Sequence, residues 1–143
     1  MKHPVIVSLL HRDPRYAYEA YEFMFEALTH TQKMFDRSPK VGEEPGKEHH
    51  VTGPEIVRGA VDLARREYGL LAQTVFHQWG VRRTSDLGEL VFNLIESQLL
   101  SKTDTDSRED FRDVFDLDRA LVESFAISLS NSDTASASKK GVR

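Results

Sequence analysis

The chain has 143 residues, with 19 Lys and Arg against 23 Asp and Glu, and it contains no cysteine. This length fits one domain that can bury a sizeable core, and the lack of cysteine excludes disulfide scaffolds, cysteine-ligated zinc, iron–sulfur clusters and a thiol nucleophile. No apolar run approaches the roughly 18–20 residues of a membrane span, and the short one at residues 5–10 is too brief for a secretory signal. We therefore expect a soluble, cytoplasmic protein.

The first predicted helix spans about residues 14–36 and is rich in aromatic side chains. Pro14 suits the first turn, and Asp13 before it can act as the N-cap. Apolar side chains recur at positions 17, 21, 24, 28 and 35, as on one face of a helix, and further rings at 16, 18, 23 and 25 widen that stripe. We interpret the stripe mainly as core. Tyr18 and Phe25 remain candidates for a partner or self-association surface.

Three more helices are predicted after a surface loop at residues 37–50, where Pro and Gly occur without any apolar period. Thr52 and Glu55 form a capping-box pattern, and the helix that follows runs to about residue 68, where Gly69 suits a C-terminal stop. A short helix spans about residues 70–79 and ends at Gly80. The next helix has three possible N-caps, Thr84, Ser85 and Asp86, and runs to about residue 99.

Two strands are predicted next, over residues 99–103 and 111–117, and a final short helix over residues 118–129. Helices followed by a hairpin are the element order of a winged helix. We therefore predict a mainly α domain, in which a winged-helix-like three-helix plus β-hairpin unit follows a long N-terminal aromatic helix. Residues 1–127 form this single globular domain, and residues 128–143 form a disordered tail because they contain few large apolar groups.

A winged helix raises the hypothesis of DNA binding, with residues 86–99 as the recognition helix. The exposed face of that helix carries Glu89, Asn93 and Glu96 but no Lys or Arg, and phosphates repel carboxylates. The basic side chains available for phosphate contacts lie at the end of one helix and in a later turn: Arg65, Arg66, Arg82 and Arg83. A divergent DNA-binding winged helix is therefore the alternative hypothesis, and nucleic-acid binding is disfavoured.

The most acidic part of the chain is residues 101–127, which carry four basic and eight acidic side chains. We interpret Asp104, Asp106 and Asp110, on the predicted hairpin, as a docking surface for another protein or a second copy of the chain. A calcium loop starting at Asp104 needs Gly where Glu109 stands and a bidentate Glu where Phe115 stands. The pattern therefore does not predict a calcium site.

Polar residues elsewhere show no catalytic or metal-binding pattern. Glu19, Glu22, Glu26 and His30 line one stripe of the first helix, but a carboxylate-bridged metal site uses Glu-x-x-His pairs on two helices, which are missing here. The sequence also has no Gly-x-Ser-x-Gly elbow, no phosphate-binding glycine loop and no dinucleotide fingerprint. We expect no cofactor, no metal and no enzymatic activity.

Several longer strings resemble a family of small uncharacterised bacterial proteins known mainly from planctomycete-type genomes. They are RYAYEAYEF at residues 15–23, VTG at 51–53, WGV at 79–81, LSKT at 100–103 and DFRDVFD at 110–116. The resemblance covers roughly residues 11–120 and implies no activity and no catalytic residue. The residues themselves therefore carry the functional prediction, which is a small protein-interaction or regulatory module that binds another protein or forms a homodimer.

Overall fold

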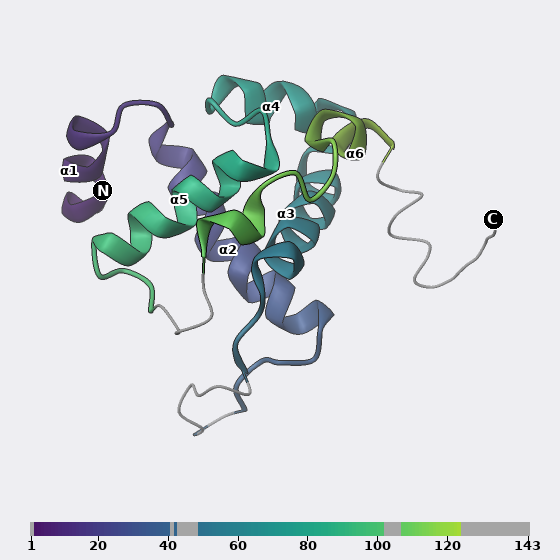
Figure 1. The fold of residues 1–143 in the computed structure, drawn as a ribbon, viewed down its shortest axis with the longest axis horizontal. Coiled ribbons are helices and arrows are strands. Elements are labelled where there is room, and N and C mark those ends of the chain that lie inside the picture. Colours follow the sequence, from purple (N-terminus) through teal and green to yellow (C-terminus); the bar gives the residue numbers. More distant parts are fainter. Residues whose placement is uncertain (1, 41, 43–48, 102–106, 124–143) are drawn as a thin grey trace.

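The computed structural model describes residues 2–40, 42, 49–101 and 107–123, which fold as packed helices (Figure 1). The helices are α1 (Pro4–Arg12), α2 (Tyr18–Met34), α3 (Gly53–Tyr68), α4 (Ala72–Gln78), α5 (Thr84–Glu96) and α6 (Leu117–Glu123), with the 3₁₀-helices η2 (Gly69–Leu71) and η3 (Arg108–Phe111). The predicted mainly α class is confirmed. Within the described ranges, no helix is both long and apolar enough to cross a membrane.

The predicted β-hairpin, and with it the winged helix, is wrong for the residues that can be judged. Residues 99–101 and 107–117 contain no strand, and η3 forms where the second strand was expected to begin. Phe111, Val114 and Phe115 break the alternation that a strand needs, and residues 112–115 form turns and bends instead. Ser107 also favours a turn, because its hydroxyl accepts a hydrogen bond from the Glu109 amide at 3.2 Å. Residues 102–106 lie outside the described part.

The N-terminal region differs from the prediction, because α1 is an additional helix and α2 begins at Tyr18 rather than near residue 14. The Asp13 carboxylate does not cap a helix but accepts a hydrogen bond from the Arg15 amide at 3.2 Å, which closes a tight turn. The extended residue Ala17 then donates its amide hydrogen to the Trp79 carbonyl at 3.1 Å. This contact ties the start of α2 to the end of α4.

Helices α2 and α3 lie side by side at the centre of the fold (Figure 1). Their backbones come close at Gly59, where a Cβ atom would lie 1.8 Å from the Thr31 Oγ1 atom. Thr31 is buried, and its hydroxyl donates a hydrogen bond to the Ala27 carbonyl at 2.6 Å. A glycine is therefore required at position 59 for this separation of the two helices.

The ends of α3 confirm two predicted signals. The Thr52 hydroxyl accepts from the Glu55 amide at 3.3 Å, and the Glu55 carboxylate accepts from the Thr52 amide at 2.8 Å, which completes the capping box. At the other end, Gly69 has a φ of +54°, a conformation that favours glycine. These two signals fix the length of α3, which positions its side chains against α2.

An aromatic cluster joins α2, α3 and α4. The Phe23 ring lies 5.4 Å from the Phe76 and Trp79 rings and 6.3 Å from the Tyr68 ring, measured between centroids. Offset and edge-to-face pairs at these distances add about 0.5–1.5 kcal/mol each to the effect of burial. Much of the predicted aromatic stripe is therefore core.

The buried Phe111 of η3 packs where glycines leave space. A Cβ atom at Gly88 would lie 2.6 Å from the Phe111 Cβ atom, and one at Gly53 would lie 3.1 Å from its ring. The Thr84 hydroxyl donates to the Phe111 carbonyl at 2.7 Å and accepts from the Val114 amide at 3.2 Å. These contacts hold the segment after α5 against α3 and α5. The predicted tail at residues 128–143, and the predicted final helix beyond Glu123, lie outside the described residues.

Candidate functional site

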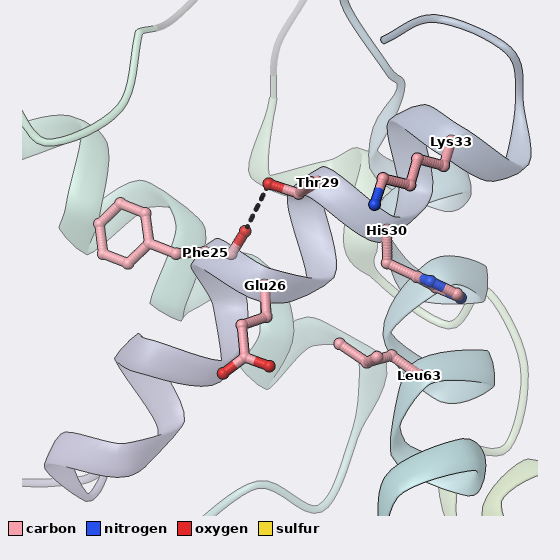
Figure 2. Close-up of a pocket in the computed structure, with 6 residues that line it drawn as sticks. All are labelled: Phe25, Glu26, Thr29, His30, Lys33 and Leu63. Atoms are coloured by element: carbon pink, nitrogen blue, oxygen red, sulfur yellow. Dashed lines mark hydrogen bonds between the residues drawn. The ribbon is translucent and has the colours of Figure 1, made fainter.

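An open groove of about 420 Å³ lies between α2 and α3 (Figure 2). It is lined by one residue of α3, Leu63, and by five residues of α2, which are Phe25, Glu26, Thr29, His30 and Lys33. Phe25 and Leu63 are partly buried and supply the apolar part of the lining. We call this feature the α2–α3 groove.

His30 connects the groove to a charged cluster on α3. Its Nε2 atom lies 2.7 Å from the Asp62 Oδ2 atom, which also accepts from the Arg66 Nε atom at 2.7 Å. Burial by itself raises the pKa of Asp62, but the hydrogen bonds from His30 and Arg66 outweigh it and place that pKa below its ordinary value. The Asp62 carboxylate therefore already has its partners within this cluster.

Catalysis by the His30–Asp62 pair would require a nucleophile within hydrogen-bonding reach of the ring. Thr29 supplies the hydroxyl among the groove residues, and it donates to the Phe25 carbonyl at 3.3 Å instead (Figure 2). Among the described residues there is also no group of three or more His, Asp or Glu side chains that could hold a metal ion.

The two ends of the groove carry opposite charges. At one end, the Glu26 carboxyl lies within hydrogen-bonding range of Glu67, and burial together with this like charge raises the pKa of Glu26. At the other end, Lys33 is exposed and forms no ion pair with the described residues. Among the described residues, neither Glu26 nor Glu67 forms an ion pair with an Arg or Lys. The groove thus has an acidic end and a basic end.

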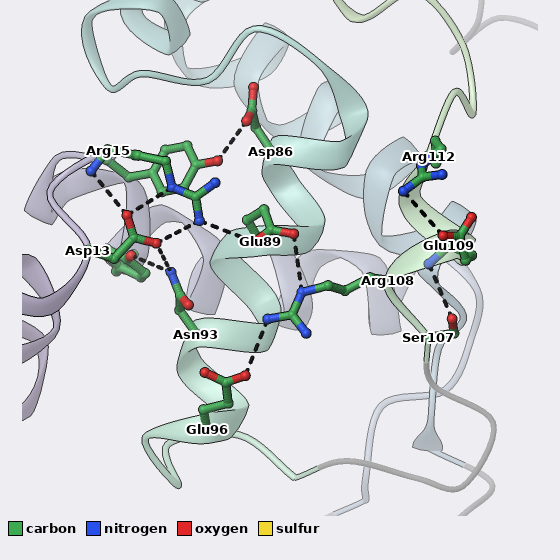
Figure 3. A network of polar contacts seen from close by, with 12 residues as sticks. Asp13, Arg15, Asp86, Glu89, Asn93, Glu96, Ser107, Arg108, Glu109 and Arg112 are labelled. Carbon is green, nitrogen blue, oxygen red and sulfur yellow. Dashed lines mark hydrogen bonds and ion pairs between the residues drawn. The ribbon is translucent and has the colours of Figure 1, made fainter.

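The outer face of α5, in contrast, is covered by ion pairs (Figure 3). Arg15 bridges Asp13 at 2.7 Å and Glu89 at 3.1 Å, and Arg108 bridges Glu89 and Glu96 at 3.2 Å each. Hydrogen bonds from Arg15 hold the pKa of Asp13 well below its ordinary range. The face that the DNA-binding alternative would use is therefore occupied by side chains from the N-terminal turn and η3.

Buried and partly buried hydrogen bonds connect this network to the rest of the fold, and Asn93, expected on the exposed face of the helix, is buried. The Asn93 amide donates to the Asp13 carboxylate at 3.0 Å and to the Tyr21 hydroxyl at 3.1 Å. Tyr16 donates to the Asp86 carboxylate at 2.6 Å. These bonds connect α2 and the preceding turn to α5, so the network contributes to the fold.

The residues predicted to form the interaction surface are separated by the fold. Phe25 lines the groove, but Tyr18 is only 6% exposed; the Lys2 ammonium lies over its ring and the His3 amide donates to its hydroxyl. Asp110 is exposed on η3, away from the groove lining. Asp104 and Asp106 lie outside the described residues.

The four arginines predicted as phosphate contacts belong to two elements. Arg65 and Arg66 are in the last turn of α3, where Arg66 pairs with Asp62. Arg82 and Arg83 are exposed in the turn before α5, and their amides donate to the Asp86 carboxylate at 2.9 and 3.1 Å. The proposal that all four contact phosphates stays a prediction.

The comparisons with known proteins do not add to this geometry. No family model, curated protein or solved structure matches the chain. The resemblance to a planctomycete-type family stays a prediction. The function proposed for the chain is therefore based on its own residues.

Sequence reasoning missed the groove residues Thr29, Lys33 and Leu63, and also Asp62 and Glu67, which contact His30 and Glu26 of the lining. The spacing of Glu26 and His30 on one stripe was visible, as was the i,i+4 pair of Asp62 and Arg66. What could not be read from the sequence is which side of the first long helix α3 covers.

Proposed function

We propose that the chain is a protein-interaction module that binds its partner in the α2–α3 groove. The observation that carries the proposal is the charge arrangement of the groove. An apolar lining from Phe25 and Leu63 is flanked by the Glu26–Glu67 pair at one end and by Lys33 at the other. A binding partner with the opposite order of charges would pair both ends.

Two further observations support this proposal over the alternatives. The outer face of α5 already has its carboxylates paired with Arg15 and Arg108, so it offers few free groups to a ligand. DNA binding has less support than at the sequence level, because Arg66, one of the four arginines available for phosphate contacts, pairs with Asp62.

Site-specific photo-crosslinking in the native cell tests the proposal. A benzophenone amino acid at Thr29 lies in the groove, and the same group at the exposed Arg119 of α6 is the control. We expect a discrete crosslinked protein from position 29 that is absent from position 119 and is lost when Lys33→Glu is added. Identical crosslinks from both positions, or none from position 29, would contradict the proposal.

A further inference from the structure

The exposed side of α2 has a charge order that is complementary to itself. Glu26 and Lys33 both line the groove and are seven residues apart. Seven residues are close to two helical turns, about 10.5 Å along the axis, so both side chains project from the same side of α2. One end of this stripe is therefore negative and the other positive.

Antiparallel pairing of two such helices brings unlike charges together. If a two-fold axis passes between Thr29 and His30, residue 26 of each copy faces residue 33 of the other, and the contact occurs twice. Parallel pairing in register places Glu26 against Glu26 and Lys33 against Lys33, which is repulsive. The charge order thus favours an antiparallel second copy over a parallel one.

We propose that the occupant of the α2–α3 groove is a second copy of this chain, docked with its α2 antiparallel to the first. This inference rests on the proposed function and specifies its partner. In the dimer, Lys33 of each copy lies beside the Glu26–Glu67 pair of the other, where it offsets the repulsion between these two carboxylates. The contact also covers the partly buried Phe25 and Leu63.

Charge reversal at the two ends tests the inference directly. In an antiparallel dimer, Glu26→Lys creates two Lys–Lys contacts and Lys33→Glu creates two Glu–Glu contacts. We expect each variant to dimerise at least about tenfold more weakly than the native chain, because two attractive pairs become repulsive. Sedimentation equilibrium of the full chain, at protein concentrations from about 1 μM to 1 mM, measures the dissociation constants.

Mixing the two variants gives the sharper result. A Glu26→Lys chain and a Lys33→Glu chain present unlike charges to each other at both contacts, so we expect an equimolar mixture to form a heterodimer. The double variant with both reversals should likewise regain a homodimer. Arg82→Glu, a charge reversal in the exposed turn before α5, is the matched control and should leave the dissociation constant unchanged.

The controls separate folding and other partners from the proposed contact. Circular dichroism melting of every variant identifies loss of fold, and regained dimerisation in the mixture cannot arise from unfolded chains. A native chain that stays monomeric up to 1 mM, or a dimer that is unaffected by Glu26→Lys, would overturn the inference. In that case a position-29 crosslink to a different protein still supports the interaction module, whereas no crosslink at that position overturns both proposals.

Discussion

The close approach of α2 and α3 at Gly59 predicts the effect of one added methyl group. In a Gly59→Ala variant, the new Cβ atom would lie 1.8 Å from the Thr31 Oγ1 atom and 2.7 Å from its Cβ atom. Ordinary van der Waals contact begins at 3.4 Å, so the two helices must separate by more than about 1 Å. This separation would widen the α2–α3 groove and pull His30 away from Asp62.

The expected change in unfolding free energy of Gly59→Ala is the difference between two opposing contributions. Overpacking a well-packed interior costs about 1–3 kcal/mol, and the upper end applies here because the clash involves atoms close to the α2 backbone. Alanine gains about 1 kcal/mol over glycine inside a helix. We expect Gly59→Ala to lose about 2 kcal/mol of unfolding free energy, a decrease in Tm of roughly 4–8 °C.

Urea denaturation of Gly59→Ala, Thr31→Ala and the double variant measures the coupling between the two sites. Thr31→Ala alone loses the 2.6 Å hydrogen bond to the Ala27 carbonyl, about 1 kcal/mol. The double variant removes the closest contact, so its loss should be smaller than the sum of the two single losses by about 1 kcal/mol or more. Arg58→Ala, an exposed change one residue away, should stay within about 0.5 kcal/mol of the native chain. Additive losses at positions 31 and 59 would refute the reasoning.

Three further predictions concern buried polar contacts. Asn93→Asp replaces an amide that donates to Asp13 at 3.0 Å with a second carboxylate. By urea denaturation, we expect the unfolding free energy to fall by about 2–3 kcal/mol at pH 7 and by less at pH 4, where the carboxylates begin to be protonated. Equal losses at the two pH values would contradict this reasoning. The pKa of Asp13 lies below its ordinary value of 3.8 because a neighbouring guanidinium donates to it, so its contribution to stability is present above that value and is lost as the pH falls below it. Asp13→Asn should therefore flatten the decrease in unfolding free energy between pH 5 and pH 2, and an unchanged slope would count against this assignment. Thr84→Val should cost about 2 kcal/mol by thermal melting, because the Phe111 carbonyl and the Val114 amide both lose their hydrogen-bond partner, and retained amide exchange protection at Val114 would disprove it.

The candidate site could be predicted from the sequence only in part. Tyr18 and Phe25 are two turns apart on one stripe and look equivalent in the sequence. They differ in the structure because Lys2 and His3, just before α1, contact Tyr18, and α1 itself was not predicted. The acidic groups of α5 likewise looked like an open face, but they pair with Arg15 and Arg108, which are 74 and 19 residues away from Glu89 in the chain.

The sequence by itself determined those features that depend on neighbours along the chain. These are the helical class, the capping box of Thr52 and Glu55 and the glycine stop at Gly69, because each involves residues within one or two turns of each other. Tertiary structure alone decided the replacement of the expected hairpin by η3 and the position of the groove. Both depend on where glycines allow distant segments to approach, at Gly59 for α2 and α3 and at Gly88 for Phe111, and a local pattern contains no information about such distances.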